Sequence, residues 1–369
     1  MYQITQKDPI FSLRERADNI SELIKDYRVG EIKLIDQDHV MKWLKQFNEA
    51  DQLIIAEEIE HIIKQSYLSK NSTIDLLKKM LKTDKIFGDI QTNYPNIKFM
   101  RVSRKGSSQN DLLKLIEIIL KEDYGIDIEM CGTSPKKYIY IDDCIYSGNT
   151  VYYDLKNWLE ENNELVIEEL HTVFLASYLH GYSSFKNKRM PALLKELNLD
   201  INFQSSCWQA NYFKNYSKYY SSYNCCWPLK INEQDKNEDV LWFEDYLENQ
   251  FQSSGSKISP RKYRTKDNLN DSLFTSKKSR AILERAFLEK GAYITTLPKK
   301  LPGSMRPLGF EKYHSLGFGS LFFTYRNIAN NCPLVLWWGD SDYEESHPFS
   351  KWHPLLPRKI NGNASVIFS

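Results

Sequence analysis

Hydrophobic positions in the first stretch of the chain, to about Lys85, recur every three or four residues among polar ones. This spacing is typical of amphipathic helices, and Asp38 is a candidate N-cap for one of them. The segment contains no group of catalytic side chains, and His39 and His61 stand alone. We therefore expect an N-terminal helical region over residues 1–95 that acts as a scaffold.

From residue 96 the pattern changes to short apolar runs that alternate with amphipathic stretches. The expected strands are 97–102, 126–130, 138–141, 166–178 and 201–204. The expected helices are 111–121, one that ends at about residue 160, and 191–197. Strands that alternate with helices predict an α/β fold with a parallel sheet, here over residues 96–210.

Beyond residue 211 the periodic pattern weakens, and we expect a C-terminal α+β extension over 211–369. Residues 257–280 form a basic, Ser-rich segment, which is read either as a solvated linker or as a strip that contacts nucleic-acid phosphates. A helix over 279–290 should end at Gly291. The apolar patch with Trp337 and Trp338 is expected to be core rather than a platform for a ligand.

Composition limits the classes of function. With 369 residues, 41% hydrophobic and 26% charged, the chain can bury a sizeable core of two or three domains. A net charge of +1 excludes a protein that binds polyanions over its whole surface. No apolar run is long enough to span a membrane, and the N-terminus has no secretory pattern. The six cysteines lack metal-type spacing, so we expect a cytoplasmic protein with free thiols.

One segment carries the chemistry. An apolar strand, 138–141, runs into two adjacent carboxylates, Asp142 and Asp143. A short turn then opens a helix, with the residues Tyr146, Ser147, Gly148, Asn149 and Thr150. Ligands bind at the carboxyl end of parallel strands, and amides at a helix N-terminus can hold a phosphate dianion. Two carboxylates beside a phosphate suit hydroxyl groups or Mg²⁺, which together describe a phosphorylated sugar with a metal. The plainer reading is a strand followed by a turn with acids as N-caps.

This segment resembles the phosphoribosyl-pyrophosphate (PRPP) signature of type I phosphoribosyltransferases. The resemblance implies that Asp142 and Asp143 hold the ribose hydroxyls, with Mg²⁺ bound mainly through PRPP. It also implies that residues 146–150 hold the 5-phosphate. Tyr146 stands where purine-salvage members have an acid, which argues against ordinary purine salvage.

The family also has a pyrophosphate loop one strand-helix unit upstream of the signature. Here the corresponding residues are Ser103, Arg104, Lys105, Gly106 and Ser107. Their two cations and backbone amides suit a leaving group on which charge grows as the anomeric bond breaks. The resemblance therefore makes Arg104 and Lys105 catalytic candidates; taken alone, the segment would be an exposed basic turn. The long lid between loop and signature is short or absent, with 132–137 as the remaining loop.

A more specific resemblance covers most of the chain. Residues 317–327, 330–334 and the Trp pair look like the C-terminal segment of the PRTase-CE group. These are phosphoribosyltransferase-like proteins of bacterial conflict and anti-phage systems. The resemblance implies an effector encoded beside a nucleic-acid sensor, a reverse transcriptase or an ATPase. It also leaves Arg326, Asn330 and Asn331 as candidates for the acceptor side of the site.

Three classes of function follow. The first is an enzyme that displaces pyrophosphate from PRPP, or reacts another ribosyl phosphate, in favour of an unknown acceptor. The second is a module that binds PRPP or a nucleotide without turnover and regulates a partner. The third, secondary because the whole chain is near neutral, binds nucleic acid through 257–280. Release of pyrophosphate distinguishes the first class from the second.

Overall fold

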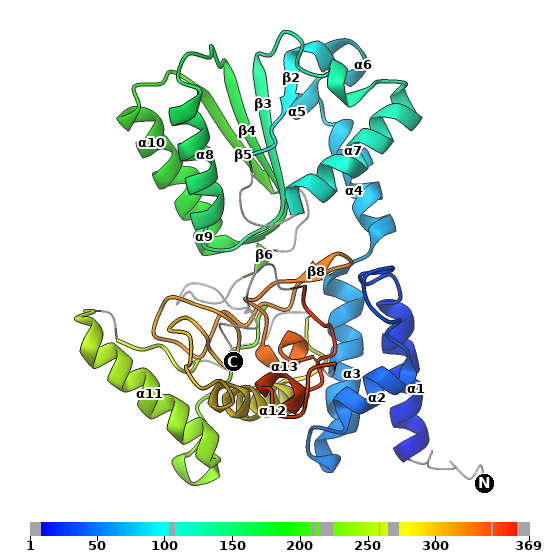
Figure 1. Ribbon diagram of the computed structural model, residues 1–369, viewed down its shortest axis with the longest axis vertical. Helices are drawn as coiled ribbons and strands as arrows, with labels where there is room; N and C mark the ends of the chain where they lie inside the picture. The colour runs from blue at the N-terminus through cyan, green and yellow to red at the C-terminus, as the bar shows by residue number, and fades with distance from the viewer. Residues whose placement is uncertain are drawn as a thin grey trace. The chain divides into compact units, whose positions relative to one another are not determined.

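The computed structural model describes residues 9–102, 108–207, 212–213, 224–257, 259–264, 273–340 and 342–359. The chain forms two compact units (Figure 1). The sheet unit comprises Lys70–Tyr216, and the terminal unit comprises Met1–Ser69 together with Ser217–Ser369. This grouping differs from the predicted ranges 1–95, 96–210 and 211–369, because apolar residues from the first helices and from the last third of the chain share one core.

The sheet unit is built on a parallel sheet with the strand order β2-β3-β4-β5. The strands are β2 (Ile97–Phe99), β3 (Lys137–Ile145), β4 (Glu169–Tyr178), β5 (Asn202–Cys207) and β6 (Tyr212–Phe213), the last pairing with the end of β4. Each of the pairings between them is parallel. The predicted α/β fold with a parallel sheet is therefore confirmed.

Helices cover the sheet on two sides, with α8, α9 and α10 on one side of it in Figure 1 and α4 and α7 on the other. The helices of this unit are α4 (Lys70–Leu81), α5 (Asp84–Phe87), α6 (Ile90–Asn93), α7 (Ser108–Tyr124), α8 (Asn149–Glu161), α9 (Leu179–Ser184), the π-helix η3 (Phe185–Arg189) and α10 (Met190–Glu196). Tyr138 and Tyr140 of β3 share a core with Leu155 of α8 and Met190 of α10. Alternate residues of β3 thus face these helices, as a period of two requires.

One predicted strand is wrong. Residues 126–130 do not form a strand: Ile128–Met130 is a short 3-10 helix. The Asp127 carboxylate accepts a hydrogen bond from the Glu129 amide at 3.0 Å, which closes a turn in place of an extended backbone. The alternating apolar pattern here reflects burial of Ile126 and Ile128 between exposed neighbours.

The terminal unit is mainly helical. Its helices are α1 (Pro9–Leu23), α2 (Gln37–Leu44), α3 (Glu49–Ser66), α11 (Glu238–Ser254), α12 (Lys277–Thr296) and α13 (Leu334–Trp337). A small sheet joins β1 (Tyr67–Leu68), β7 (Phe323–Thr324) and β8 (Asn327–Ile328). Trp337 and Trp338 are buried in the core of this unit, in agreement with their interpretation as core residues.

Two predicted helix ends differ from the structure. The N-cap of α2 is Asp36 rather than Asp38, because the Asp36 carboxylate accepts from the His39 amide at 2.9 Å. Helix α12 does not end at Gly291 but continues to Thr296. Gly291 instead permits a close approach, since a Cβ there would lie 2.5 Å from the Pro307 carbonyl oxygen.

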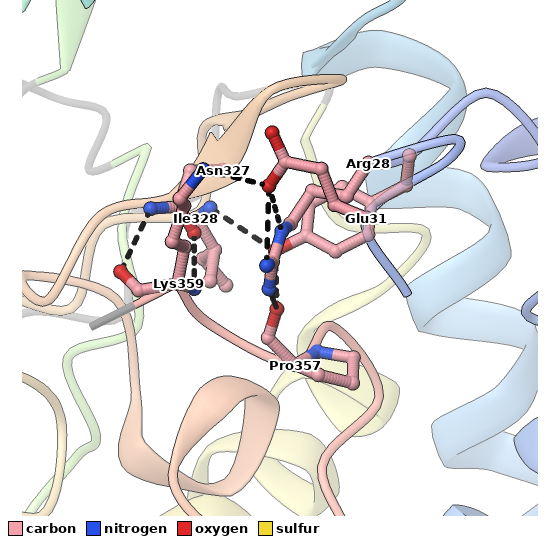
Figure 2. A network of polar contacts seen from close by, with 7 residues as sticks. Arg28, Glu31, Asn327, Ile328, Pro357 and Lys359 are labelled. Atoms are coloured by element: carbon pink, nitrogen blue, oxygen red, sulfur yellow. Dashed lines mark hydrogen bonds and ion pairs between the residues drawn. The ribbon is translucent and has the colours of Figure 1, made fainter. Parts of the chain in front are cut away.

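Polar contacts fasten the N-terminal part of the terminal unit to the β7–β8 hairpin and to the C-terminal segment (Figure 2). Arg28 donates to the Pro357 carbonyl oxygen at 2.8 Å, and the Glu31 carboxylate pairs with both Arg28 and Lys359. Asn327 and Lys359 exchange two hydrogen bonds, at 3.0 and 3.1 Å. Specific polar contacts, as well as the apolar core, thus hold together residues that are more than 300 positions apart in the chain.

Across the described ranges, no helix combines the length and the apolar character that crossing a membrane requires.

Candidate functional site

The two adjacent carboxylates lie near the carboxyl end of β3 and are half-buried. The strand runs to Ile145, so both acids belong to its last part and do not follow it. Tyr140 and Asp142 face the same side of the sheet, where the Tyr140 hydroxyl donates to Asp142 Oδ2 at 3.4 Å. Since successive residues of a strand point to opposite faces, Asp143 points to the other side. The two carboxylates therefore lie on opposite faces of the sheet, near the carboxyl end of β3.

Backbone amides fix both carboxylates. The Asp143 amide donates to Asp142 Oδ1 at 2.9 Å, and the Cys144 amide donates to Asp143 Oδ1 at 2.7 Å. Each acid is thereby held by the residue that follows it, and the pair presents a defined set of oxygens at the strand end.

Two neighbours of the acids, the buried Tyr140 and the half-buried Cys144, are uncharged at neutral pH. Burial, together with the charges of Asp142 and Asp154, raises the pKa of Tyr140 well above its usual value, so its hydroxyl stays protonated as a donor. Burial and the Asp143 carboxylate likewise raise the pKa of the Cys144 thiol. A protonated thiol is a poor nucleophile, so Cys144 acts here as a small apolar side chain beside Asp143.

The chain then turns and opens α8. Gly148 is the N-cap residue, with φ of +73°, a left-handed conformation that glycine adopts without strain. The Asn149 amide donates to Ser147 Oγ at 3.3 Å, and the side chains of Ser147 and Thr150 are exposed. The first turn of α8 carries no acidic residue. Tyr146, Ser147, Gly148, Asn149 and Thr150 therefore lie together at a helix N-terminus, where the macrodipole favours an anion.

The predicted pyrophosphate loop, Ser103, Arg104, Lys105, Gly106 and Ser107, lies outside the described residues. The residues on either side of it are described. The Val102 amide donates to Oε1 of the fully buried Gln109 at 2.7 Å. This hydrogen bond joins the segment that follows β2 to α7. Strands β2 and β3 are parallel neighbours, with Phe99 opposite Ile139. Val102 follows β2 and the acid pair lies in the last part of β3, so both are near the carboxyl ends of neighbouring parallel strands.

Three residues that sequence reasoning missed pack directly on the turn at 146–149. They are Gly181 of α9 and Phe185 and Arg189 of η3. An added Cβ at Gly181 would lie 1.7 Å from the Tyr146 carbonyl oxygen, and one at Gly148 would lie 3.0 Å from Phe185 Cβ. Gly181, Phe185 and Arg189 are spaced four positions apart in a helical segment that follows β4, whereas the turn follows β3. This spacing is the sequence signal that could have placed them on one helix face.

The candidate acceptor residues belong to the terminal unit. Arg326 is half-buried in the turn between β7 and β8. The Asn330 carbonyl accepts from the Phe310 amide, and Asn331 Nδ2 donates to the Phe310 carbonyl, both at 2.8 Å. Asn330 and Asn331 therefore hold the Phe310 segment in place. A role for the three residues toward an acceptor stays a prediction.

The structure corrects the interpretation of the basic segment 257–280 at two positions. Arg264 and Arg280 are buried rather than solvated, and both pair with the buried Glu284. Among the described basic residues of this segment, those with exposed side chains are Lys257, Arg261, Lys277 and Lys278. Any strip available to phosphates is accordingly smaller than the sequence indicates.

The acid pair fits a magnesium ion that is shared with a bound phosphate. The described residues contain no cluster of three or more His, Cys, Asp or Glu side chains that could hold a metal alone. Mg²⁺ usually takes one or two carboxylates and completes its shell with substrate phosphates and water. Asp142 and Asp143 supply hard oxygen ligands of that kind.

Comparison with known proteins links the chain to a protein family. No curated protein and no solved structure matches the chain. The family model PRTase-CE matches residues 40–358, which span most of the chain and include the acid pair and the turn. A parallel sheet with an acid pair and a helix N-terminus at its carboxyl edge agrees with that match. The chain therefore belongs to the PRTase-CE family of phosphoribosyltransferase-like proteins.

Proposed function

We propose that the protein is a transferase that uses Mg-PRPP, or a related ribosyl phosphate, and transfers or releases its phosphoribosyl group. The observation that carries this proposal is the acid pair at the end of β3, which leads through an exposed turn into the N-terminus of α8. Carboxylates accept hydrogen bonds from hydroxyl groups, whereas a helix N-terminus binds a phosphate. A sugar phosphate offers both within one molecule.

In this proposal, each part of the edge binds one part of the ligand. Asp142 and Asp143 accept hydrogen bonds from the ribose hydroxyls and stabilise the positive charge that develops on the ring. The amides and hydroxyls of residues 146–150 hold the 5-phosphate. Arg104 and Lys105 neutralise the pyrophosphate, which departs with the electron pair of the anomeric C–O bond. The acceptor, a base, a nucleotide, a macromolecule or water, then forms the new bond to the anomeric carbon.

Magnesium, when bound with the diphosphate, would add positive charge beside the leaving group. The residues of this chain that would contact it are Asp142 and Asp143. Their role in the proposal does not depend on the metal alone, because carboxylates also orient the sugar through its hydroxyls.

The biological setting that we propose is anti-phage defence. The PRTase-CE group is associated with bacterial conflict systems, and an effector that consumes PRPP or modifies a nucleotide would harm an infected cell. A partner encoded beside it, such as a nucleic-acid sensor, a reverse transcriptase or an ATPase, would then control the activity.

Release of pyrophosphate from Mg-PRPP by the purified full-length protein tests the enzyme proposal. We expect Asp142→Asn and Asp143→Asn each to lower the rate by at least tenfold, the effect of about 1.4 kcal/mol of lost transition-state stabilisation. Asp200→Asn is the matched control, because Asp200 is exposed and precedes β5, at the amino end of the sheet. Mg-PRPP binding without pyrophosphate release would favour the regulatory module that senses PRPP or a nucleotide.

A further inference from the structure

The segment from α9 through η3 packs along one face of the turn at 146–149. Gly181, Phe185 and Arg189 are spaced four residues apart, and each contacts a different part of residues 146–149. The stretch that carries Phe185 and Arg189 is a π-helix, a rare form that recurs at functional sites. These contacts come from the helical segment that follows β4. They therefore connect the turn to a part of the sheet unit that lies outside the segment 138–150.

Arg189 makes the polar contacts of this face. Its Nη1 donates to Asn149 Oδ1 at 2.8 Å and lies 3.5 Å from the Ser147 carbonyl oxygen. Its guanidinium carbon lies 4.2 Å from the centre of the Tyr152 ring, on the next turn of α8. The guanidinium is therefore held between the turn and the first residues of α8, and its side chain is half-buried.

This contact decides how the Asn149 side chain is oriented. A carboxamide has one acceptor oxygen and one NH2 donor. When the oxygen accepts from Arg189, the NH2 group points away from the guanidinium and becomes a donor at the N-terminus of α8. Arg189 also places a positive charge beside the turn, where Asp142 and Asp143 would otherwise repel an anion.

We propose that Arg189 is a positioning residue for the sugar phosphate: it orients the Asn149 carboxamide and the Ser147 backbone toward a phosphomonoester dianion and offsets the charge of the acid pair. The proposal rests on the proposed function of the site and deepens it. It names the group that Arg189 serves, which is the phosphomonoester and not the diphosphate.

The test uses calorimetric titration of the full-length protein with three probes: ribose 5-phosphate, inorganic pyrophosphate with Mg²⁺, and Mg-PRPP. The variants are Arg189→Gln and Arg189→Lys, and Lys188→Gln is the matched control, since Lys188 is the exposed neighbour. We expect Arg189→Gln to weaken ribose 5-phosphate and Mg-PRPP at least tenfold at pH 7.5 and to leave pyrophosphate within twofold. Arg189→Lys should recover part of the loss, and Lys188→Gln should behave as the wild type.

A charge readout separates positioning from mere support of the fold. The second pKa of a phosphomonoester is about 6, so the ligand is mostly a dianion at pH 7.5 and mostly a monoanion at pH 5. The loss caused by Arg189→Gln should therefore be smaller at pH 5 than at pH 7.5. The affinity of the wild type for ribose 5-phosphate should also fall more steeply with salt than that of the variant.

The outcomes are distinguishable. If the wild type binds the probes and Arg189→Gln binds ribose 5-phosphate equally well, the role of Arg189 is refuted while the proposed function stands. Equal losses for ribose 5-phosphate and pyrophosphate, independent of pH and with a lowered thermal midpoint, would show a structural role and also refute it. A wild type that binds none of the three probes would refute the proposed function, and this proposal with it.

Discussion

At the residue scale, the geometry of the turn at 146–149 depends on the absence of a side chain at Gly181. A Cβ at this helical position would lie 1.7 Å from the Tyr146 carbonyl oxygen, a backbone atom that cannot simply rotate away. Gly→Ala inside a helix ordinarily stabilises by about 1 kcal/mol. Here we expect the opposite, because the collision must displace either α9 or the turn.

We predict that Gly181→Ala lowers the free energy of unfolding by about 1–3 kcal/mol, the usual cost of overpacking, and weakens ribose 5-phosphate binding. Denaturant unfolding and calorimetry measure the two effects. Gly303→Ala is the control, because its nearest neighbour is the end of a flexible glutamine side chain at 3.6 Å. A Gly181→Ala protein as stable as the wild type would contradict the close approach.

His171 makes a second prediction, on the pH dependence of stability. The ring is 1% exposed, and burial together with the charge of Lys137 lowers its pKa to about 4. The folded state therefore binds this proton less readily than the unfolded state does. The stability that comes from keeping His171 neutral is fully present above pH 6.5 and is lost as the pH falls from 6.5 to 4. The total loss in the free energy of unfolding is about 3 kcal/mol.

Urea unfolding between pH 7.5 and 4 measures this effect. His171→Gln should flatten the decline, whereas His180→Gln, at an exposed position of the same unit, should leave the slope unchanged. Equal slopes in the wild type and in His171→Gln would show that another group is responsible. His353, whose pKa burial lowers to about 3, should add a separate decline from the terminal unit.

At this scale, the sequence allows the contiguous part of the site to be predicted and little else. Asp142 to Thr150 form one run whose residue types match the roles proposed for them, so a local pattern suffices. Gly181 and Arg189 are brought to the turn by the fold of β4 and α9, about 40 residues later. Arg189 lies in a Lys-rich stretch that resembles an ordinary solvated helix face. Apart from its spacing of four residues from Phe185, nothing local distinguishes it from Lys188.

At the element scale, a buried ionic cluster fixes α12. Glu284 Oε1 accepts from Arg280 Nε at 2.8 Å, and Glu284 Oε2 accepts from Arg264 Nη2 at 3.0 Å. All three side chains are almost completely buried. The Trp227 amide also donates to Glu284 at 3.0 Å, so the cluster joins the helix to the 225–227 segment.

We predict that Arg280→Gln destabilises the protein by about 3 kcal/mol, because removal of one partner leaves a buried charge with fewer counter-charges. Arg285→Gln, one turn further along the same helix and 46% exposed, should change stability by less than about 0.5 kcal/mol. Denaturant unfolding of the two variants decides the point. Similar small effects would mean that the cluster is not stabilising.

The elements also show where local pattern is sufficient. The strand over 138–141 was predictable because four apolar residues in a row fit a strand buried on both faces. The prediction over 126–130 was wrong because Asp127 forms a local turn that an alternating pattern does not reveal. The predicted helix end at Gly291 was wrong because this glycine allows the Pro307 backbone to approach closely. Only the tertiary fold brings Pro307 near it.

At the scale of the whole molecule, the sheet unit is inserted between two parts of the terminal unit. Ile59 of α3 and Phe287 of α12 share one core although 228 residues separate them, whereas the core around Tyr140 and Phe174 belongs to the sheet unit. Helical periodicity predicted the first helices but not their partner. An amphipathic face indicates that it is buried and does not indicate against what.

The central claim is that the acid pair and the turn at the end of β3 bind a ribosyl phosphate. The most direct test is a calorimetric titration of Mg-PRPP into the wild type and into the Asp142→Asn/Asp143→Asn variant. The matched control is Asp200→Asn/Glu164→Gln, which removes two exposed charges that precede β5 and β4. We predict binding by the wild type and the control, and a loss of at least tenfold in the acid-pair variant with an unchanged thermal midpoint. Equal binding by all three proteins would contradict the assignment of the site.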